Sequence, residues 1–459
     1  MFKKYIGDRK FYKMVLTLGL PIMIQNGISN FVNLLDNIMV GSVGTEQMSG
    51  VAVANQFMFV FNLCVFGAIS GAGIFSSQFY GKKDHEGIRY CFRFKFLSVL
   101  LLSAVAVLIF SFFQEPLISQ YLKGNAGQGD PTMVLQCGKD YITIMLCGLL
   151  PFGLTQMYSG TLREQNQTLV PMVAGLTAVA VNLGFNWLLI FGHWGFPELG
   201  IRGAAIATVI SRFVELAIVV MYTHLNREKY PFIVGAYSSM HIPGKLFKDM
   251  VIKGTPLLVN EGLWSAGVAV LSQKYSLCGL IVVGAQNISN TVSTFFNMIY
   301  MSFGTAISIV VGPLLGRGES EKAVDTARKM ITFCVMVSIG VGATVALCAP
   351  LFPKLYNVSP DVRDLARRLL IVTGCCSPIN GFVHASYFTI RSGGKTLITF
   401  LFDSAFMWCV VIPTATILVN FTSITIIPLF LTVSLMEGIK CIVAFILIRK
   451  RVWIRKLVD

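Results

Sequence analysis

Asp36 is an acidic residue inside an otherwise apolar stretch, and asparagines stand on both sides of it. No basic residue follows it at helical spacing. A lone carboxylate inside a bilayer costs about 2.5–3.5 kcal/mol on insertion scales, so it must hold a proton, bind a cation or pair with another helix. Hard cations such as Na⁺ take oxygen ligands. We therefore predict a Na⁺ or H⁺ coupling site in which Asp36 is the sole charge and oxygens come from Asn182, Asn186 and Thr208. The alternative is a structural hydrogen bond to a neighbouring helix.

Glu261 is the second acidic residue of this kind, in another apolar stretch. It follows Pro256 by five residues, and a proline inside a helix leaves one backbone carbonyl without its hydrogen-bond partner. Asn260 and Trp264 flank it. We predict that Glu261 is also a cation-coupling residue, or that it attracts a cationic substrate. The alternative is a carboxyl group that is satisfied inside its own helical bundle.

Amide, aromatic and thioether side chains in the apolar stretches are candidates for a substrate cleft. Thioethers adapt to ligands of different shape, and aromatic rings attract organic cations. The predicted cleft residues are Gln25, Asn26, Asn260, Trp264, Asn380, Met23, Met298 and Tyr300.

Other charges in the apolar stretches are expected to be structural. Glu437 and Lys440 are three residues apart, which places opposite charges on one helix face. Asp403 is expected to meet Lys395 or water.

Membrane-spanning helices are the elements that must position these side chains. The 459 residues are 54% hydrophobic and only 13% charged, which is too little charge to cover a soluble domain of this size. Apolar runs of about 20 residues, the length that a bilayer core requires of a helix, recur along the chain. We predict an all-α integral membrane protein with twelve transmembrane helices at about 14–40, 51–79, 94–114, 137–160, 168–191, 203–224, 250–275, 284–312, 330–350, 366–389, 396–419 and 424–448.

The net charge of +15 could indicate a nucleic-acid partner, but the position of the basic residues argues against one. They cluster at the N-terminus, in every second loop and at the C-terminus. The positive-inside rule then predicts that both termini and the basic loops lie in the cytoplasm. Most of the eleven cysteines lie in apolar runs, so we expect reduced thiols, and no metal-ligand spacing is present.

The two halves of the chain repeat each other. Gly19-Leu20-Pro21 returns 235 residues later as Gly254-Thr255-Pro256, and Thr161-Leu162-Arg163 returns 228 residues later as Thr389-Ile390-Arg391. Six spans per half make both halves cross in the same sense, so a pseudo-twofold axis along the membrane normal is expected. The predicted domains are an N-terminal six-helix lobe at 1–224, a cytoplasmic linker at 225–249 and a C-terminal six-helix lobe at 250–459.

The motif around Asp36 resembles that of the bacterial multidrug and toxic compound extrusion (MATE) transporters. The segment from Asp36 to Gly44 is close to the pattern D-x-x-M-V-G-x-x-G, and Asn182-x3-Asn186 also resembles a stretch typical of the family. The resemblance implies a V-shaped pair of six-helix bundles that expels small molecules in exchange for Na⁺ or H⁺. Some branches carry an acid at position 186, and others an aspartate at position 380. This chain has Asn186 and Asn380, so its coupling chemistry depends on fewer carboxylates.

The predicted function is therefore cation-coupled export of amphipathic, cationic small molecules by alternating access. We expect a monomer in the plasma membrane with no cofactor other than the coupling Na⁺ or H⁺. The alternative is a flippase for lipid-linked saccharides on the same architecture, although such proteins usually have extra helices or a strongly basic cavity. An enzyme is not expected, because no paired carboxylates, histidine cluster or nucleophile–base spacing is present.

Overall fold

The structure is a computed structural model, and it describes residues 5–122, 130–356, 358–422 and 424–458. Packing divides the chain into two compact units. Unit 1 comprises Met1–Met23, Ser77–Asp84 and Ile252–Asp459, and unit 2 comprises Ile24–Ser76 and His85–Val251. The predicted domain boundaries stay a prediction, because the units are defined by packing and not by the repeat or by membrane topology.

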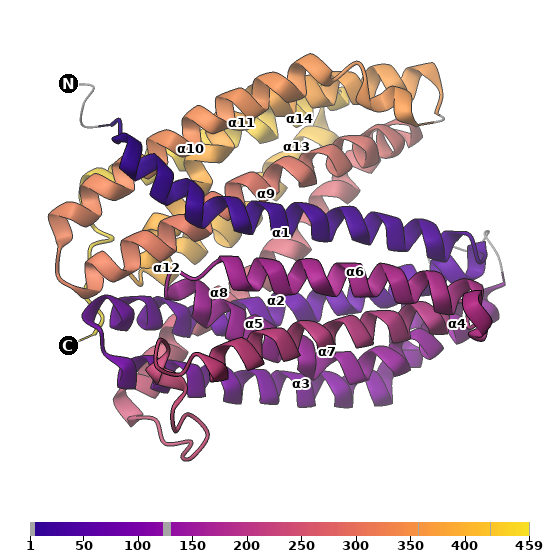
Figure 1. Ribbon diagram of the computed structural model, residues 1–459. Helices are drawn as coiled ribbons and strands as arrows, with labels where there is room; N and C mark the ends of the chain where they lie inside the picture. The colour runs from indigo at the N-terminus through magenta and orange to yellow at the C-terminus, as the bar shows by residue number, and fades with distance from the viewer. Residues whose placement is uncertain (1–4, 123–129, 357, 423, 459) are drawn as a thin grey trace. The chain divides into compact units, whose positions relative to one another are not determined.

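Unit 2 is a bundle of helices that run side by side (Figure 1). Within it, α6 packs on α7, α5 contacts both α3 and α7, and α4 contacts α3 and α7. Its helices are the C-terminal part of α1 (Arg9–Gly41), most of α2 (Thr45–Lys82), α3 (His85–Leu122), α4 (Pro131–Met145), α5 (Leu149–Glu164), α6 (Leu169–Phe191) and α7 (Ile201–Leu225). Short 3₁₀ turns join α4 to α5 at Leu146–Gly148 and α6 to α7 at His193–Gly195, and a third, Pro231–Ile233, follows α7.

Local sequence explains where several of these helices begin and end. The Asp130 side chain accepts a hydrogen bond of 2.9 Å from the backbone N–H of Thr132, and Pro131 stands at the first position of α4. Aspartate at the N-cap and proline directly after it are the favoured residues at these places. Helix α6 ends at Gly192, whose φ of 69° is left-handed and therefore suits glycine.

Unit 1 contains the remaining helices. In this unit α11 is central, because it packs against α9, α10 and α14. The helices are α8 (Gly244–Ser276) from Ile252 onward, α9 (Leu280–Gly316), α10 (Ser320–Cys348), α11 (Pro360–Ser392), α12 (Thr396–Phe400), α13 (Ile412–Phe421) and α14 (Ile426–Arg449), with a 3₁₀ turn at Phe352–Leu355. Two π-helical turns, η6 (Leu401–Ala405) and η7 (Met407–Val411), connect α12 to α13, so residues 396–421 form one continuous span.

Eleven helices of the described chain are long and apolar enough to cross a membrane. They coincide with eleven of the twelve predicted spans, and most extend several residues beyond the predicted bounds. The twelfth, predicted at 250–275, is the helix α8, which is not among these eleven and carries Lys253, Glu261 and Lys274. The all-helical membrane fold is therefore confirmed.

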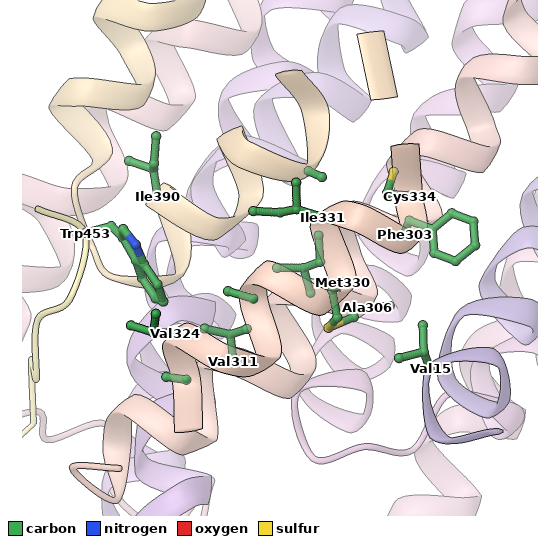
Figure 2. Packing of buried hydrophobic residues seen from close by; sticks show 14 of the residues in the cluster. Val15, Phe303, Ala306, Val311, Val324, Met330, Ile331, Cys334, Ile390 and Trp453 are labelled. Carbon is green, nitrogen blue, oxygen red and sulfur yellow. The ribbon is translucent and has the colours of Figure 1, made fainter. Parts of the chain in front are cut away.

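One hydrophobic cluster of unit 1 includes a residue from the end of the chain. Trp453 is fully buried beside side chains of α9, α10 and α11, and Figure 2 shows it next to Val324. Two hydrogen bonds fix the same tail to Gln78. The backbone N–H of Leu457 donates to Oε1 of Gln78 at 2.8 Å, and Nε2 of Gln78 donates to the carbonyl of Arg455 at 3.2 Å. The C-terminal tail is therefore part of the folded unit.

The segment predicted as a linker is packed against α3 in unit 2. The guanidinium of Arg93, which is 7% exposed, donates to three backbone carbonyls of this segment. These bonds reach Ala236 at 2.9 Å, His241 at 3.0 Å and Gly235 at 2.8 Å. Residues 235–241 therefore have a defined place on the bundle.

Candidate functional site

Asp36 meets two asparagines of α6 inside unit 2. Nδ2 of Asn186 donates a hydrogen bond of 2.6 Å to Oδ1 of Asp36 and one of 3.2 Å to Oδ1 of Asn182. Asn182 and Asn186 are 5% and 1% exposed, so water does not surround this group. Because the two asparagines are four residues apart, they lie on one face of α6.

Thr208 of α7 completes the cluster that the sequence predicts. Its hydroxyl lies 3.3 Å from the side-chain amide of Asn182 and donates to the carbonyl of Ala204 at 3.0 Å. Asp36, Asn182, Asn186 and Thr208 are thus brought together by three helices. Their proximity follows from the fold, and their role in binding a cation stays a prediction.

The amide of Asn182 can face the carboxylate in two ways. With its nitrogen turned toward Asp36, it donates at 3.0 Å to Oδ1 and at 3.1 Å to Oδ2, and its oxygen accepts from Thr208 at 3.3 Å. The bond from Asn186 to Asn182 is then lost, because the two amide nitrogens face each other at 3.2 Å. In the opposite orientation the Asn182 oxygen faces carboxylate oxygens. Oxygens so placed repel each other unless a proton or a cation lies between them.

The oxygen Oδ1 of Asn186 is buried and has no hydrogen-bond partner among the described residues. Such a group is costly, and each case in a native protein needs an explanation. Together with the carboxylate, it offers oxygen atoms only, which suits a hard monovalent cation. Within the described ranges, no three His, Cys, Asp or Glu side chains are placed to hold a metal ion together.

A close approach between α6 and α7 sets the distance between the asparagines and Thr208. Gly203 of α7 lies so near α6 that an added Cβ would be 2.5 Å from the carbonyl oxygen of Leu189. Only glycine allows this contact without a shift of one helix. Gly203 was not predicted as a site residue from the sequence. Tyr141 of α4 was not predicted either; its side chain is buried and interacts with Thr208.

The second predicted acid, Glu261 of α8, lies in unit 1. It is partly buried and within electrostatic reach of Arg391 and Asp403. The neighbouring Asn260 is 2% exposed and donates to Oδ2 of Asp403 at 3.1 Å and to the hydroxyl of Tyr387 at 3.4 Å. Glu261 therefore belongs to a group of charges, unlike the isolated Asp36.

The family model named MatE matches residues 21–188 and 258–417, one stretch in each half. The chain belongs to the MatE family. It is therefore a multi-pass membrane transporter, as the resemblance of its motifs implied.

Several relatives of this MatE chain cover most of its length. A protein of Thermotoga maritima named "Probable multidrug resistance protein NorM" is 24% identical over 92% of this chain and 89% of its own. The "Uncharacterized transporter YisQ" of Bacillus subtilis is 24% identical over 98% and 96%. A solved MATE family transporter in an outward-facing conformation has a TM-score of 0.84 and 19% identity, covering 98% of this chain and 97% of that one. This structural likeness shows the fold.

The predicted substrate-cleft residues of the MatE chain fall into both units. Gln25 and Asn26 belong to unit 2, where Oε1 of Gln25 accepts a hydrogen bond of 2.8 Å from Arg163. The other six are in unit 1. Among these, Trp264 is 39% exposed, Asn260 and Tyr300 are buried, and Met23 packs against the hydrophobic cluster of Trp453; Met298 and Asn380 are partly buried. Their role in binding substrate stays a prediction.

Two charged side chains of the MatE chain have partners that the sequence did not predict. Asp403 was expected to meet Lys395 or water. It instead accepts a hydrogen bond from Asn260 and lies 3.6 Å from Nζ of Lys440. The expected contact with Lys395 is therefore wrong. Asp403 lies in the π-helical turn at 401–405, and its side chain is 23% exposed. Lys95 follows the basic residues Lys82 and Lys83 in the sequence, but it is 1% exposed and pairs with Glu164 at 2.6 Å.

Proposed function

We propose that this chain is a secondary active transporter that exports amphipathic, cationic small molecules in exchange for Na⁺ or H⁺. The observation that carries the proposal is a single carboxyl group held by two buried asparagines, one of which has an unpartnered oxygen. The names of relatives such as the Thermotoga maritima protein support the export of drugs. Such relatives are less than 30% identical, so they suggest the class of substrate and no single compound.

Rotation of the Asn182 side-chain amide would let the site bind and release the coupling ion. In the ion-free state its nitrogen donates to the Asp36 carboxylate, which satisfies the buried charge. When Na⁺ enters, rotation of the amide presents its oxygen to the ion. The unpartnered Asn186 oxygen and the Thr208 hydroxyl are then further ligands. Proton coupling requires only that Asp36 accept the proton.

The placement of Asp36 on α1 couples ion binding to conformation. Helix α1 belongs to unit 1 up to Met23 and to unit 2 from Ile24, and Asp36 holds its last turns to α6. An ion that binds one arrangement of α1 more tightly shifts the population toward that arrangement. Substrate export then follows from alternation between two arrangements that differ in ion affinity.

The test uses everted membrane vesicles in which the Na⁺ gradient and the pH gradient are imposed separately. Transport of a cationic dye should respond to one of the two gradients in the wild type and to neither in Asp36→Asn. Asp140→Asn is the matched control, because Asp140 is a partly exposed aspartate in the same unit whose partner, Arg202, is exposed. Unchanged gradient-driven export in Asp36→Asn would contradict the coupling role.

We propose that the chain acts as a monomer in the plasma membrane, with both termini in the cytoplasm, and that Glu261 contributes to coupling from unit 1. Binding of a lipid-linked oligosaccharide by the purified protein, without binding of cationic drugs, would instead favour the flippase function.

A further inference from the structure

Lys440 is a basic residue inside a membrane-spanning helix of unit 1. Its side chain is buried at 4% exposure in α14. Nζ lies 3.0 Å from Oε1 of Glu437 and 3.6 Å from Oδ1 of Asp403. It also lies 5.2 Å from the centre of the Phe406 ring. Carboxylates and an aromatic face surround this ammonium group, and both are favourable partners for any small monovalent cation.

The carboxyl group of Asp403 is held in place from its other side. Asn260 donates to Oδ2 of Asp403, which leaves Oδ1 for Lys440. The Asn260 amide is itself fixed, since its Oδ1 accepts from the hydroxyl of Ser404 at 2.7 Å and from the Ser404 N–H at 3.3 Å. The acid is therefore oriented before any counter-charge reaches it.

The residue equivalent to Asp403 in the first half of the repeat is not acidic. The spacing of 228 residues relates Asp403 to Gly175, and the spacing of 235 relates Asn260 to Gln25. The equivalent pair is also in contact in unit 2, where an added Cβ on Gly175 would lie 2.7 Å from Nε2 of Gln25. Unit 1 therefore has the carboxylate of Asp403 at this position, and unit 2 has Gly175, which has no side chain.

We propose that the ammonium group of Lys440 is a resident counter-cation that occupies a monovalent-cation site formed by Asp403 and Glu437. The tethered ammonium keeps exchangeable Na⁺ and K⁺ out of the site. Lys440 is thus a specificity-determining residue, and the site formed by Asp403 and Glu437 takes up no metal ion during a transport cycle. A site for a small alkali cation appears when the ammonium is removed.

An ordinary structural ion pair makes a different prediction. Loss of Lys440 would then destabilise unit 1 to the same extent in every salt, because the remaining carboxylates would have no special affinity for a small ion. A resident counter-cation predicts instead that the loss is repaired by Na⁺ or K⁺ and not by a large organic cation. The substitution leaves the nearby charged residues Glu261 and Arg391 in place, so they do not distinguish the two explanations.

The experiment measures the thermal unfolding midpoint of purified protein in NaCl, KCl and N-methyl-D-glucamine chloride at one ionic strength. All variants carry Asp36→Asn, so the result does not depend on the proposed coupling site. Asp36→Asn alone should show no difference between the salts. Asp36→Asn with Lys440→Met should unfold roughly 2–4 °C higher in NaCl or KCl than in the organic salt, with a saturable dependence on concentration.

Adding Asp403→Asn to that double variant should remove the difference between the salts. The proposal is overturned if the double variant responds equally to all three salts, or if the triple variant keeps the alkali-specific shift. It is also overturned if Asp36→Asn alone shows a shift that requires Asp403. Should Lys440→Met prevent folding, Lys440→Gln serves as the second variant, since it is equally uncharged and can still donate to Asp403.

Discussion

Nδ2 of Asn186 lies 2.6 Å from Oδ1 of Asp36, and this hydrogen bond joins α6 to α1 within unit 2. The distance is typical of a strong bond between an N–H group and a charged oxygen. Since Asn186 is 1% exposed, no solvent molecule can readily take over its function. The strength of the proposed coupling site should therefore depend on this amide.

Asn186→Leu should weaken the response to the coupling ion without removing it. The variant keeps the carboxyl group of Asp36 but loses the unpartnered Asn186 oxygen that is proposed as an ion ligand. A polar bond to a charged group contributes about 1.5–3 kcal/mol. The ion concentration for half-maximal export should rise roughly 10–150-fold. Gln136→Leu is the control, because Gln136 is exposed and its Nε2 donates to a carboxylate, Asp140, at 3.0 Å. An equal effect in both variants would argue against a special role for Asn186.

Gly203→Ala should disturb the same site from a distance. The new methyl group would meet the backbone carbonyl of Leu189, so α7 must move away from α6 and carry Thr208 with it. Overpacking of this kind costs about 1–3 kcal/mol, seen as a lower unfolding midpoint, and the ion response should weaken as well. Gly184→Ala in α6 is the matched control, since an added Cβ there has nothing within 4 Å. Comparable losses in the two variants would disprove the packing argument.

The sequence was sufficient to predict the helices and the cluster around Asp36, for identifiable reasons. Apolar runs of bilayer length have few alternatives to a helix. The spacing of Asn182 and Asn186 fixes both on one face of α6, whichever helix lies opposite. A charge without a local partner must then find oxygen or amide groups on another helix, and these asparagines supplied them.

The partners of Asp403 and Lys95 could not be predicted in this way. Asp403 lies in a π-helical turn, which rotates its side chain relative to a regular helix, and the sequence gives no direct signal of such a turn. Lys95 is close to a run of basic loop residues but pairs with Glu164, 69 positions further along the chain. Contacts between residues so far apart depend on how the helices pack, which local spacing does not specify.

Trp453→Ala should destabilise unit 1 although the residue lies beyond the last membrane span. Its side chain is fully buried in a cluster with residues of α9, α10 and α11, and truncation of a buried tryptophan costs about 3–5 kcal/mol. Thermal or denaturant unfolding in detergent would measure the loss. Trp194→Ala should change stability by less than about 0.5 kcal/mol, because Trp194 is 84% exposed. A tail that contributes no stability would give the same result for both tryptophans.

Lys95→Met should be strongly destabilising, and a second substitution should rescue it. Nζ of Lys95 contacts Oε2 of Glu164 at 2.6 Å and the hydroxyl of Thr161 at 3.1 Å, and the lysine is buried. Removal of one partner leaves a buried charge, which costs about 3–5 kcal/mol.

The double variant Lys95→Met with Glu164→Gln should recover most of that loss, because it leaves no unpaired charge. The same cycle on the exposed pair Lys139–Glu115 should give a coupling energy of only about 0–1 kcal/mol. Unfolding midpoints of the four proteins in each cycle provide the comparison. If Glu164→Gln added its own loss to that of Lys95→Met, the two side chains would be independent and the buried pair would not stabilise α3 against α5.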